Sequence, residues 1–215
     1  VIVAAVVVAL RFFRGGSQQD AGSTESTPAT TEAPASVWTE NGNDAVVQLV
    51  SQYYTALKAA DMTTLENVLD ASSLVDEDTV SQMNSYIEDY QNLVCYTAPG
   101  EAEGEYAVYI VYDAKFRNID TLAPGMTPAY VVTDSAGALR LVTVDYFDDR
   151  VLNYMLDISE DETIQALETD VETRYNEALA ADASLNSLVN PDGTQPASET
   201  TAAPEETTAP TETTA

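Results

Sequence analysis

Three side chains of this sequence, Tyr106, Tyr112 and Asp145, are the candidates for chemistry on a small ligand. Tyr106 and Tyr112 belong to a segment of alternating character, so a strand would point both phenols to one face. In a later segment the same alternation would place Asp145 on one face of a strand together with Leu141 and Phe147. A carboxylate can act as a general base, and phenols can donate to a developing oxyanion. The alternative is that such tyrosines bury their rings in the sheet and leave their hydroxyls at its edge.

The composition excludes several other kinds of site. The chain has no histidine, which excludes Ser-His-Asp triads, Cys-His dyads and histidine-based zinc sites. The single cysteine, Cys95, follows Leu93 and Val94 in a β-rich segment, and we interpret it as a small buried apolar residue. With 36 acidic and 8 basic residues, the formal net charge is −28. Such a chain repels phosphate backbones, so nucleic acid is excluded as a partner.

Runs of acidic residues at 76–78, 148–149 and 157–162 supply the oxygen ligands that calcium prefers. None of them matches the spaced calcium-loop pattern. Helix N-termini, which favour carboxylates as caps and as partners of the helix dipole, explain the first and third runs without a metal. We therefore predict neither a metal nor a cofactor.

The composition divides the chain into four parts. Residues 1–10 are entirely apolar, yet ten helical residues span only about 15 Å of a hydrocarbon core of roughly 30 Å. We predict that residues 1–14 are the end of a truncated transmembrane anchor; a trimmed signal peptide or a merely apolar terminus is the alternative. Residues 15–37 and 190–215 are rich in Ser, Thr and Pro and predict a disordered linker and tail. Residues 38–189 predict one folded domain.

The flanks of the anchor give conflicting signals about location. Arg11 and Arg14 would place the domain in the cytoplasm by the positive-inside rule, but only one flank of the helix can be read. Thr/Pro-rich tracts on both sides of a domain are commonest in exported proteins. We give these tracts more weight and predict a single-pass protein of the cell membrane, held by its N-terminal helix, with an extracytoplasmic domain. A cytoplasmic orientation is the alternative.

Apolar spacing predicts helices in the first part of the domain. A helix capped by Asn43 or Asp44 carries Val46, Leu49, Val50, Tyr53 and Leu57 on one side. Asp61 is the expected N-cap of a short second helix, and a third is expected over 78–92. Near the C-terminal end of the domain we predict a short helix over 148–156 and a long one that begins with a capping box at Ser159 and Glu162. The long helix is expected to carry an apolar stripe of Ile164, Leu167, Val171, Tyr175 and Leu179.

Alternating residues predict strands between these helices. The segment 105–116 is apolar on both faces, so its strand is expected to be central and covered on two sides. Further strands are expected over 93–98, 127–133 and 138–147, with a loop at Pro124 and Gly125 and a hairpin turn over 134–137. Helices, antiparallel strands and helices in this order predict an α+β fold.

The run YYTALKAADMTTL from Tyr53 to Leu65, followed by a helix and long hairpin strands, resembles the opening of the nuclear transport factor 2-like superfamily, also called ketosteroid-isomerase-like or SnoaL-like. The resemblance covers roughly 44–146. It implies N-terminal helices packed on a curved, cone-like antiparallel sheet, to which this chain adds a long C-terminal helix. Anchor, tether and domain together also resemble single-pass surface proteins of Gram-positive gut bacteria.

The resemblance also implies a site and an assembly. Enzymes of the superfamily build their sites in the cone pocket from Asp, His and Tyr, so this chain could use only an Asp/Tyr arrangement, with Tyr112, Asp145 and Tyr106 as the candidates. Sheet packing between two domains is common in the superfamily, which implies a homodimer.

We predict a non-enzymatic interaction or sensing domain for an unknown protein or small ligand. The alternative is a small-ligand-binding or isomerase/lyase-type enzyme that uses the cone pocket. An open cavity with a convergent aspartate and tyrosine would favour that alternative.

Overall fold

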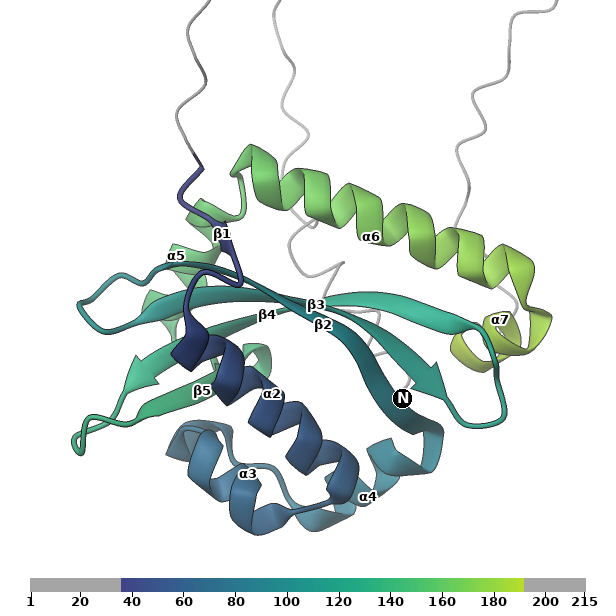
Figure 1. Cartoon of the computed structure of the whole chain (residues 1–215), viewed down its shortest axis with the longest axis horizontal. Coiled ribbons are helices and arrows are strands. Elements are labelled where there is room, and N and C mark those ends of the chain that lie inside the picture. The colour runs from purple at the N-terminus through teal and green to yellow at the C-terminus, as the bar shows by residue number, and fades with distance from the viewer. Residues whose placement is uncertain (1–35, 192–215) are drawn as a thin grey trace, which may run out of the picture.

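The computed structural model describes residues 36–191, which form an α+β domain (Figure 1). Its five strands make one open antiparallel sheet in the order β1-β2-β3-β4-β5. Within 36–191 no helix is long and apolar enough to cross a membrane. The anchor predicted for 1–14, the linker up to residue 35 and the tail from residue 192 lie outside the described residues.

Three helices precede the main strands, and each begins at a side-chain cap. They are α2 (Asp44–Ala59), α3 (Met62–Val68) and α4 (Glu77–Tyr86). The side chain of Asn43 accepts hydrogen bonds from the backbone amides of Ala45 and Val46, which confirms the first predicted cap. The Asp61 carboxylate accepts from the amide of Thr64, as predicted, and that of Asp76 accepts from the amide of Thr79. The first acidic run therefore begins with a helix cap.

The sheet consists of β1 (Thr39–Glu40), β2 (Ile87–Pro99), β3 (Tyr106–Phe116), β4 (Leu122–Thr133) and β5 (Leu139–Thr143). Strand β3 lies between β2 and β4, which confirms that it is central. The predicted hairpin turn is present: the amide of Gly137, at φ 81°, donates to the carbonyl of Asp134.

The third helix was predicted to run to residue 92, but it ends at Tyr86 and β2 begins at Ile87. The register of β2 against β3 shifts between Ile87 and Asp89 and again between Gln91 and Val94, where Asn92 has φ 53°. These irregularities interrupt the alternation of side chains along the strand. The apolar spacing of Ile87 and Tyr90 therefore imitated one turn of a helix.

The loop predicted at Pro124 and Gly125 is also wrong, because both residues lie within β4. Strand β5 pairs with β4 only from Ala129 onward, so Pro124 occupies a stretch of β4 that has β3 as its single neighbour. A proline is tolerated more easily there than between two strands, because only one side of this stretch takes part in a hydrogen-bond ladder. Gly125 lies opposite Tyr112 and leaves room for that ring, since a Cβ atom would come within 2.8 Å of it.

After the sheet come α5 (Asp149–Ile158), α6 (Glu162–Ala181) and α7 (Ala183–Val189). The predicted capping box at Ser159 is wrong: Asp161 caps α6 by accepting from the amide of Thr163. Ser159 instead follows the end of α5, where its hydroxyl donates to the carbonyl of Leu156. The predicted apolar stripe of α6 is confirmed in Ile164, Val171, Tyr175 and Leu179, which are all buried.

Helices cover both faces of the sheet (Figure 1). We call the face that packs against α2, α3 and α4 the inner face; its core includes Val50, Leu57, Val108, Ile110 and Tyr112, together with residues near the end of α6 and in α7. We call the opposite face the outer face; it packs against α5 and the first part of α6 and includes Trp38, Tyr109, Tyr130, Met155 and Ile164.

Candidate functional site

The two tyrosines predicted to share a face do so, but they lie in opposite halves of β3. Tyr112 is buried in the inner face, and the half-buried Tyr106 packs against the same core. Tyr112 pairs with Gly125 in β4, whereas Tyr106 pairs with Val131. Their spacing along an extended strand corresponds to about 20 Å. The fold therefore separates these two candidate residues along the strand.

Asp145 was predicted to lie on a strand over 138–147, but β5 ends at Thr143 and Asp145 lies in the 3₁₀ turn η2 (Val144–Tyr146), where it is exposed. The amide of Thr143 donates to the hydroxyl of Ser73 (3.2 Å), so the chain contacts the loop before α4 as the strand ends. Thr143 pairs with Ala129, so the chain leaves β5 towards the Gly125 end of β4, which pairs with the Tyr112 half of β3. Burial and the neighbouring Tyr112 are the main causes that raise the pKa of Tyr53, and the negative charge of Asp145 adds to that shift.

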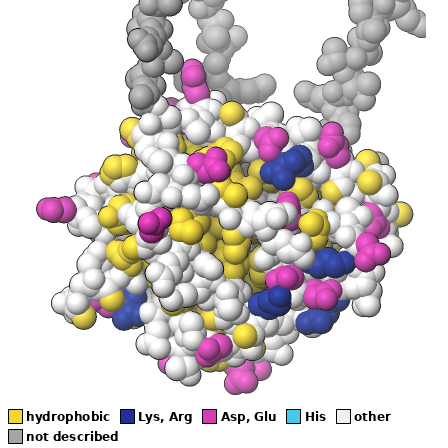
Figure 2. All heavy atoms as spheres, in the orientation of Figure 1, with side chains coloured by type: hydrophobic (Ala, Val, Ile, Leu, Met, Phe, Trp, Pro, Cys, Tyr) yellow, Lys and Arg dark blue, Asp and Glu magenta, His cyan; other side chains and the backbone are white. Residues whose placement is uncertain are grey.

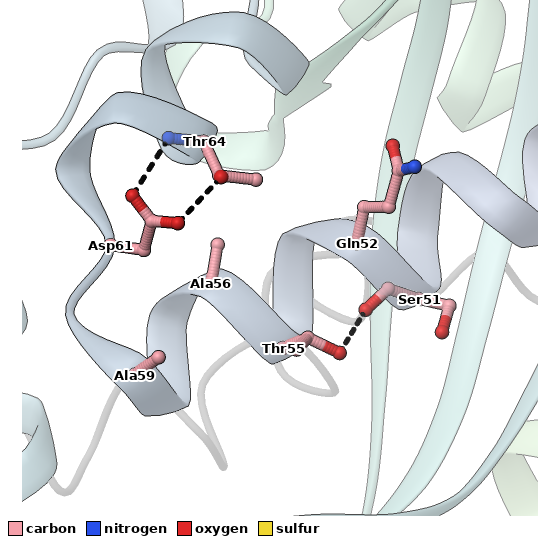
Figure 3. A pocket seen from close by; sticks show the side chains of 7 residues that line it. All are labelled: Ser51, Gln52, Thr55, Ala56, Ala59, Asp61 and Thr64. Atoms are coloured by element: carbon pink, nitrogen blue, oxygen red, sulfur yellow. Dashed lines mark hydrogen bonds between the residues drawn. The ribbon is translucent and has the colours of Figure 1, made fainter.

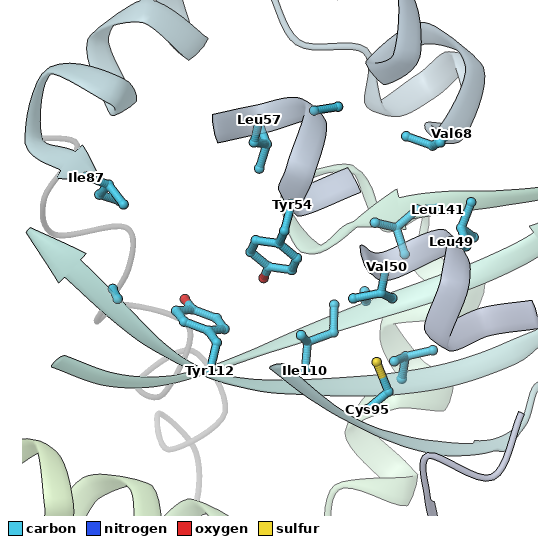
Figure 4. Packing of buried hydrophobic residues seen from close by; sticks show 14 of the residues in the cluster. Leu49, Val50, Tyr54, Leu57, Val68, Ile87, Cys95, Ile110, Tyr112 and Leu141 are labelled. Atoms are coloured by element: carbon cyan, nitrogen blue, oxygen red, sulfur yellow. The ribbon is translucent and has the colours of Figure 1, made fainter. Parts of the chain in front are cut away.

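Four phenols meet in the inner face, and we call Tyr53, Tyr54, Tyr90 and Tyr112 the tyrosine cluster. The ring of Tyr54 lies 4.8 Å from that of Tyr90 and 5.6 Å from that of Tyr112, between centroids. Figure 4 shows Tyr54 and Tyr112 reaching towards one another from α2 and β3. Edge-to-face contacts of this kind stabilise aromatic pairs beyond the area they bury.

Burial raises the pKa of Tyr53, Tyr54 and Tyr90 well above the ordinary phenol value. The hydroxyl of Tyr112 shares a hydrogen bond with that of Thr127 (3.1 Å). These phenols are therefore neutral at physiological pH and can donate a hydrogen bond but not act as bases. Cys95 is buried in the same face, as predicted, and burial raises the pKa of its thiol to about 11.

A pocket of about 460 Å³ opens beside the tyrosine cluster, between the last turns of α2 and the first half of β2. We call it the α2–β2 pocket. Its lining comprises Tyr54, Thr55, Lys58, Ala59, Asp89, Tyr90 and Leu93. Lys58 and Asp89 form an ion pair at its edge, with 2.7 Å between Nζ and Oδ1. One wall is therefore aromatic and apolar, and one edge carries an ion pair.

Neighbouring contacts fix the α2 side of this pocket. The side-chain amide of Asn84 in α4 donates to the carbonyl of Leu57 (2.8 Å), at the turn that carries Lys58. The next residues end the helix, because Ala60 adopts a left-handed conformation at φ 50°. Sequence reasoning missed the pocket because residues 87–92 were assigned to a helix. The strongest signal for it is the pair of bulky residues Tyr90 and Leu93 beside the half-buried Asp89 and the exposed Gln91.

A smaller groove of about 190 Å³ lies between α2 and α3 (Figure 3). Its most polar residue, Asp61, is engaged: its two oxygens accept from the amide and the hydroxyl of Thr64, at 3.1 and 2.6 Å. The hydroxyl of Thr55 donates to the carbonyl of Ser51 (2.7 Å). These groups serve the helices, so the α2–β2 pocket is the stronger candidate site.

The charge around the inner face is uneven. Residues 37–189 contain 28 acidic and 6 basic side chains, a net charge of −22. Figure 2 shows one side of the molecule, on which the visible lysines and arginines gather mainly at the right, beside apolar side chains near the centre. Arg117 is close to the pocket, since its Nε donates to the carbonyl of Asn84 (2.7 Å). The pocket thus has cations nearby although the domain is strongly acidic.

Comparisons with protein-family models, curated proteins and solved structures found no match to this chain. The interpretation of the site therefore depends on its own geometry.

Proposed function

We propose that this chain is a non-enzymatic sensing or interaction protein, anchored in the cell membrane by its N-terminal segment, whose extracytoplasmic domain binds a small ligand. The observation that carries the proposal is the α2–β2 pocket, with Tyr54, Tyr90 and Leu93 on its wall and the Lys58–Asp89 pair at its edge. Its volume lies within the roughly 300–1,000 Å³ typical of small-molecule sites. The apolar residues 1–10 and the Thr/Pro-rich flanks support the anchored, exported placement.

The chemistry of the lining favours binding over catalysis. The pKa values of Tyr54 and Tyr90 are raised by burial, so both phenols keep their protons at neutral pH. Asp89 is the carboxylate of the pocket, and its oxygen is paired with Lys58 at 2.7 Å. These residues are better suited to holding a ligand.

The fold also supports kinship with the nuclear transport factor 2-like superfamily, which we propose on the order of its elements. Three helices precede an antiparallel sheet and pack on one of its faces (Figure 1). In a cone of this kind the tyrosine cluster occupies the interior, and the α2–β2 pocket is an opening beside it.

A fragment screen by nuclear magnetic resonance on the full chain tests the proposed function. We expect bound fragments to shift the signals of Tyr54, Tyr90 and Leu93 more than those of any other described residues. Ala59→Phe places a ring in the pocket from an exposed helix position and should abolish these shifts, whereas Gln48→Phe adds the same ring to an exposed position of α2 outside the pocket. Shifts that survive Ala59→Phe, or a screen with no shift at the pocket, would contradict the proposal.

One observation favours the isomerase- or lyase-type alternative: Asp145 follows the end of β5 at Thr143, on the Gly125 side of β4 that pairs with Tyr112, and its charge adds to the burial that raises the pKa of Tyr53 in the cluster. In that case a ligand would bind between η2 and the cluster, with Asp145 as base and Tyr112 as donor. Asp145→Asn would then abolish turnover of a steroid-like or polyketide-like ketone by the full chain. If the wild-type chain shows no such turnover, this alternative is excluded for that substrate class.

A further inference from the structure

We propose that the ligand of the α2–β2 pocket is a zwitterion, a free α-amino acid with a large apolar or aromatic side chain. This inference rests on the proposed function and names the class of ligand. It combines three features of the pocket: the paired opposite charges at its edge, the aromatic wall and the negative charge of the surrounding domain.

The edge of the pocket presents one cation and one anion side by side. Lys58 Nζ and Asp89 Oδ1 are 2.7 Å apart, and their side chains are 51% and 31% exposed. Exposed ion pairs of this kind contribute little to stability, so they can be exchanged for contacts with a ligand. The α-carboxylate of an amino acid would bind Lys58, and its α-ammonium would bind Asp89. Every charge remains paired in this exchange.

The wall of the pocket suits an apolar side chain. Tyr54 is buried, and Tyr90 and Leu93 are half-buried where they line the pocket. The rings of Tyr54 and Tyr90 meet at 60°, so they offer both an edge and a face to a third ring. An aromatic or branched aliphatic side chain would displace water from this surface.

The net charge of the domain favours binding of a zwitterion over binding of an anion or a cation. Residues 37–189 carry a net charge of −22, which repels an anion over a distance comparable to the Debye length. A cation is attracted by the same field but meets the ammonium group of Lys58 at the pocket. A zwitterion has no net charge, and each of its groups finds an opposite charge at the edge.

Calorimetric titration of the full chain with three matched probes tests the proposal. The probes are L-phenylalanine, phenylacetate without the ammonium group, and phenethylamine without the carboxylate. We expect L-phenylalanine to bind at least tenfold more tightly than either analogue. Equal or tighter binding of an analogue would overturn the zwitterion assignment, while the proposed function would stand on the pocket shifts in the fragment screen.

Two charge variants test the two proposed contacts, with the carboxylate and with the ammonium group of the ligand, one at a time. Lys58→Gln should weaken L-phenylalanine binding at least tenfold and improve phenethylamine binding, because it leaves Asp89 free at the pocket. Asp89→Asn should weaken L-phenylalanine equally and improve phenylacetate binding. Glu88→Gln, a neighbouring exposed acid outside the pocket lining, is the matched control and should change none of these affinities. Unchanged L-phenylalanine binding in both charge variants would overturn the inference.

Discussion

The inner and outer faces of the sheet bury similar kinds of residue but differ in how far they are open to solvent. On the inner face, α2 ends at Ala60 and leaves the α2–β2 pocket open beside the tyrosine cluster. On the outer face, α6 extends over 20 residues and buries Ile164 and Val171 completely. The long helix closes the outer face, so that face serves stability. The short helices leave an opening in the inner face, which is where a ligand can bind.

The two faces also differ in whether the polar atoms of their buried aromatic side chains are hydrogen-bonded. Tyr112 on the inner face shares a hydrogen bond with Thr127. On the outer face the ring of Tyr109 packs against that of Trp38, with 5.2 Å between centroids. Neither the Tyr109 hydroxyl nor the Trp38 indole nitrogen has a hydrogen-bond partner among the described residues. On the outer face, the close packing of these two rings therefore leaves two buried polar atoms without hydrogen bonds, which is unfavourable.

The largest effect is expected at high pH, where the inner face should fail first. Burial raises the pKa of Tyr53, Tyr54 and Tyr90 above 10, so the folded state retains protons that the unfolded chain releases. This stability is fully present below pH 10 and is lost as the pH rises towards the folded-state values. We expect cooperative unfolding above about pH 11, with the last part of the phenolate absorbance change, after the exposed tyrosines have ionised, coinciding with the loss of circular dichroism.

Phenylalanine variants locate that transition on one face. Replacing Tyr53, Tyr54 and Tyr90 together by Phe should raise the alkaline midpoint more than Tyr109→Phe does, because the first variant removes three phenols with raised pKa values and the second removes one. The difference in phenolate absorbance between the wild type and the triple variant reports the cluster, because exposed tyrosines such as Tyr86 and Tyr146 contribute to both. If this difference appears while the circular dichroism stays native, the cluster ionises without unfolding.

A second comparison removes apolar atoms from each face. Ile164 is fully buried under α6, so Ile164→Ala should lower the free energy of unfolding by about 3 kcal/mol. Leu93 is half-buried in the wall of the pocket, so Leu93→Ala should cost less than about 1.5 kcal/mol. Urea denaturation at neutral pH measures both. Equal losses would mean that the pocket wall is packed as tightly as the outer face.

The packing of Tyr112 over β4 provides a third test. A Cβ atom on residue 125 would lie 2.8 Å from Tyr112 Cε2 and 3.0 Å from its Cζ. Gly125→Ala should therefore cost about 1–3 kcal/mol by displacing the ring. Combined with Tyr112→Leu, it should cost at least about 1 kcal/mol less than the two single losses added together. Strict additivity in urea denaturation would show that the ring does not rely on this glycine.

Local patterns in the sequence predicted the elements whose own residues determine them. The caps Asn43 and Asp61 and the turn from Asp134 to Gly137 act over a few residues, and all three are present. The apolar faces of β3 and the stripe of α6 were also readable, because burial on one side or both leaves a regular spacing. These features fix the order of the elements and the central position of β3.

The site depended on features that no local pattern encodes. Because β2 is bulged, Ile87 and Tyr90 do not follow the regular alternation of a strand. Their spacing therefore did not indicate the strand that forms one wall of the pocket. Gly125 suggested a loop, but it lies within a strand, where the absence of a side chain leaves room for the ring of Tyr112 on the neighbouring strand. Lys58 and Asp89 are far apart in the sequence, and their pairing arises only when α2 lies against β2. Tertiary contacts decide each of these cases.

The smallest effect contrasts two buried hydroxyls, one on each face. The hydroxyl of Tyr109 lies near Ser159 but makes no hydrogen bond of normal geometry, so Tyr109→Phe removes an unsatisfied polar atom. We expect the free energy of unfolding to stay unchanged or to rise by up to about 1 kcal/mol. Tyr112→Phe breaks the bond to Thr127 and should lower it by about 1 kcal/mol.

These two single-atom changes keep the rings in place, so their difference isolates the hydroxyl groups from the packing around them. Urea denaturation of both variants under one condition gives that difference directly. If Tyr109→Phe proves as destabilising as Tyr112→Phe, the Tyr109 hydroxyl has a partner in solution. The outer face would then keep one unsatisfied polar atom, the indole nitrogen of Trp38, and the main difference between the two faces would be the opening that α2 leaves beside β2.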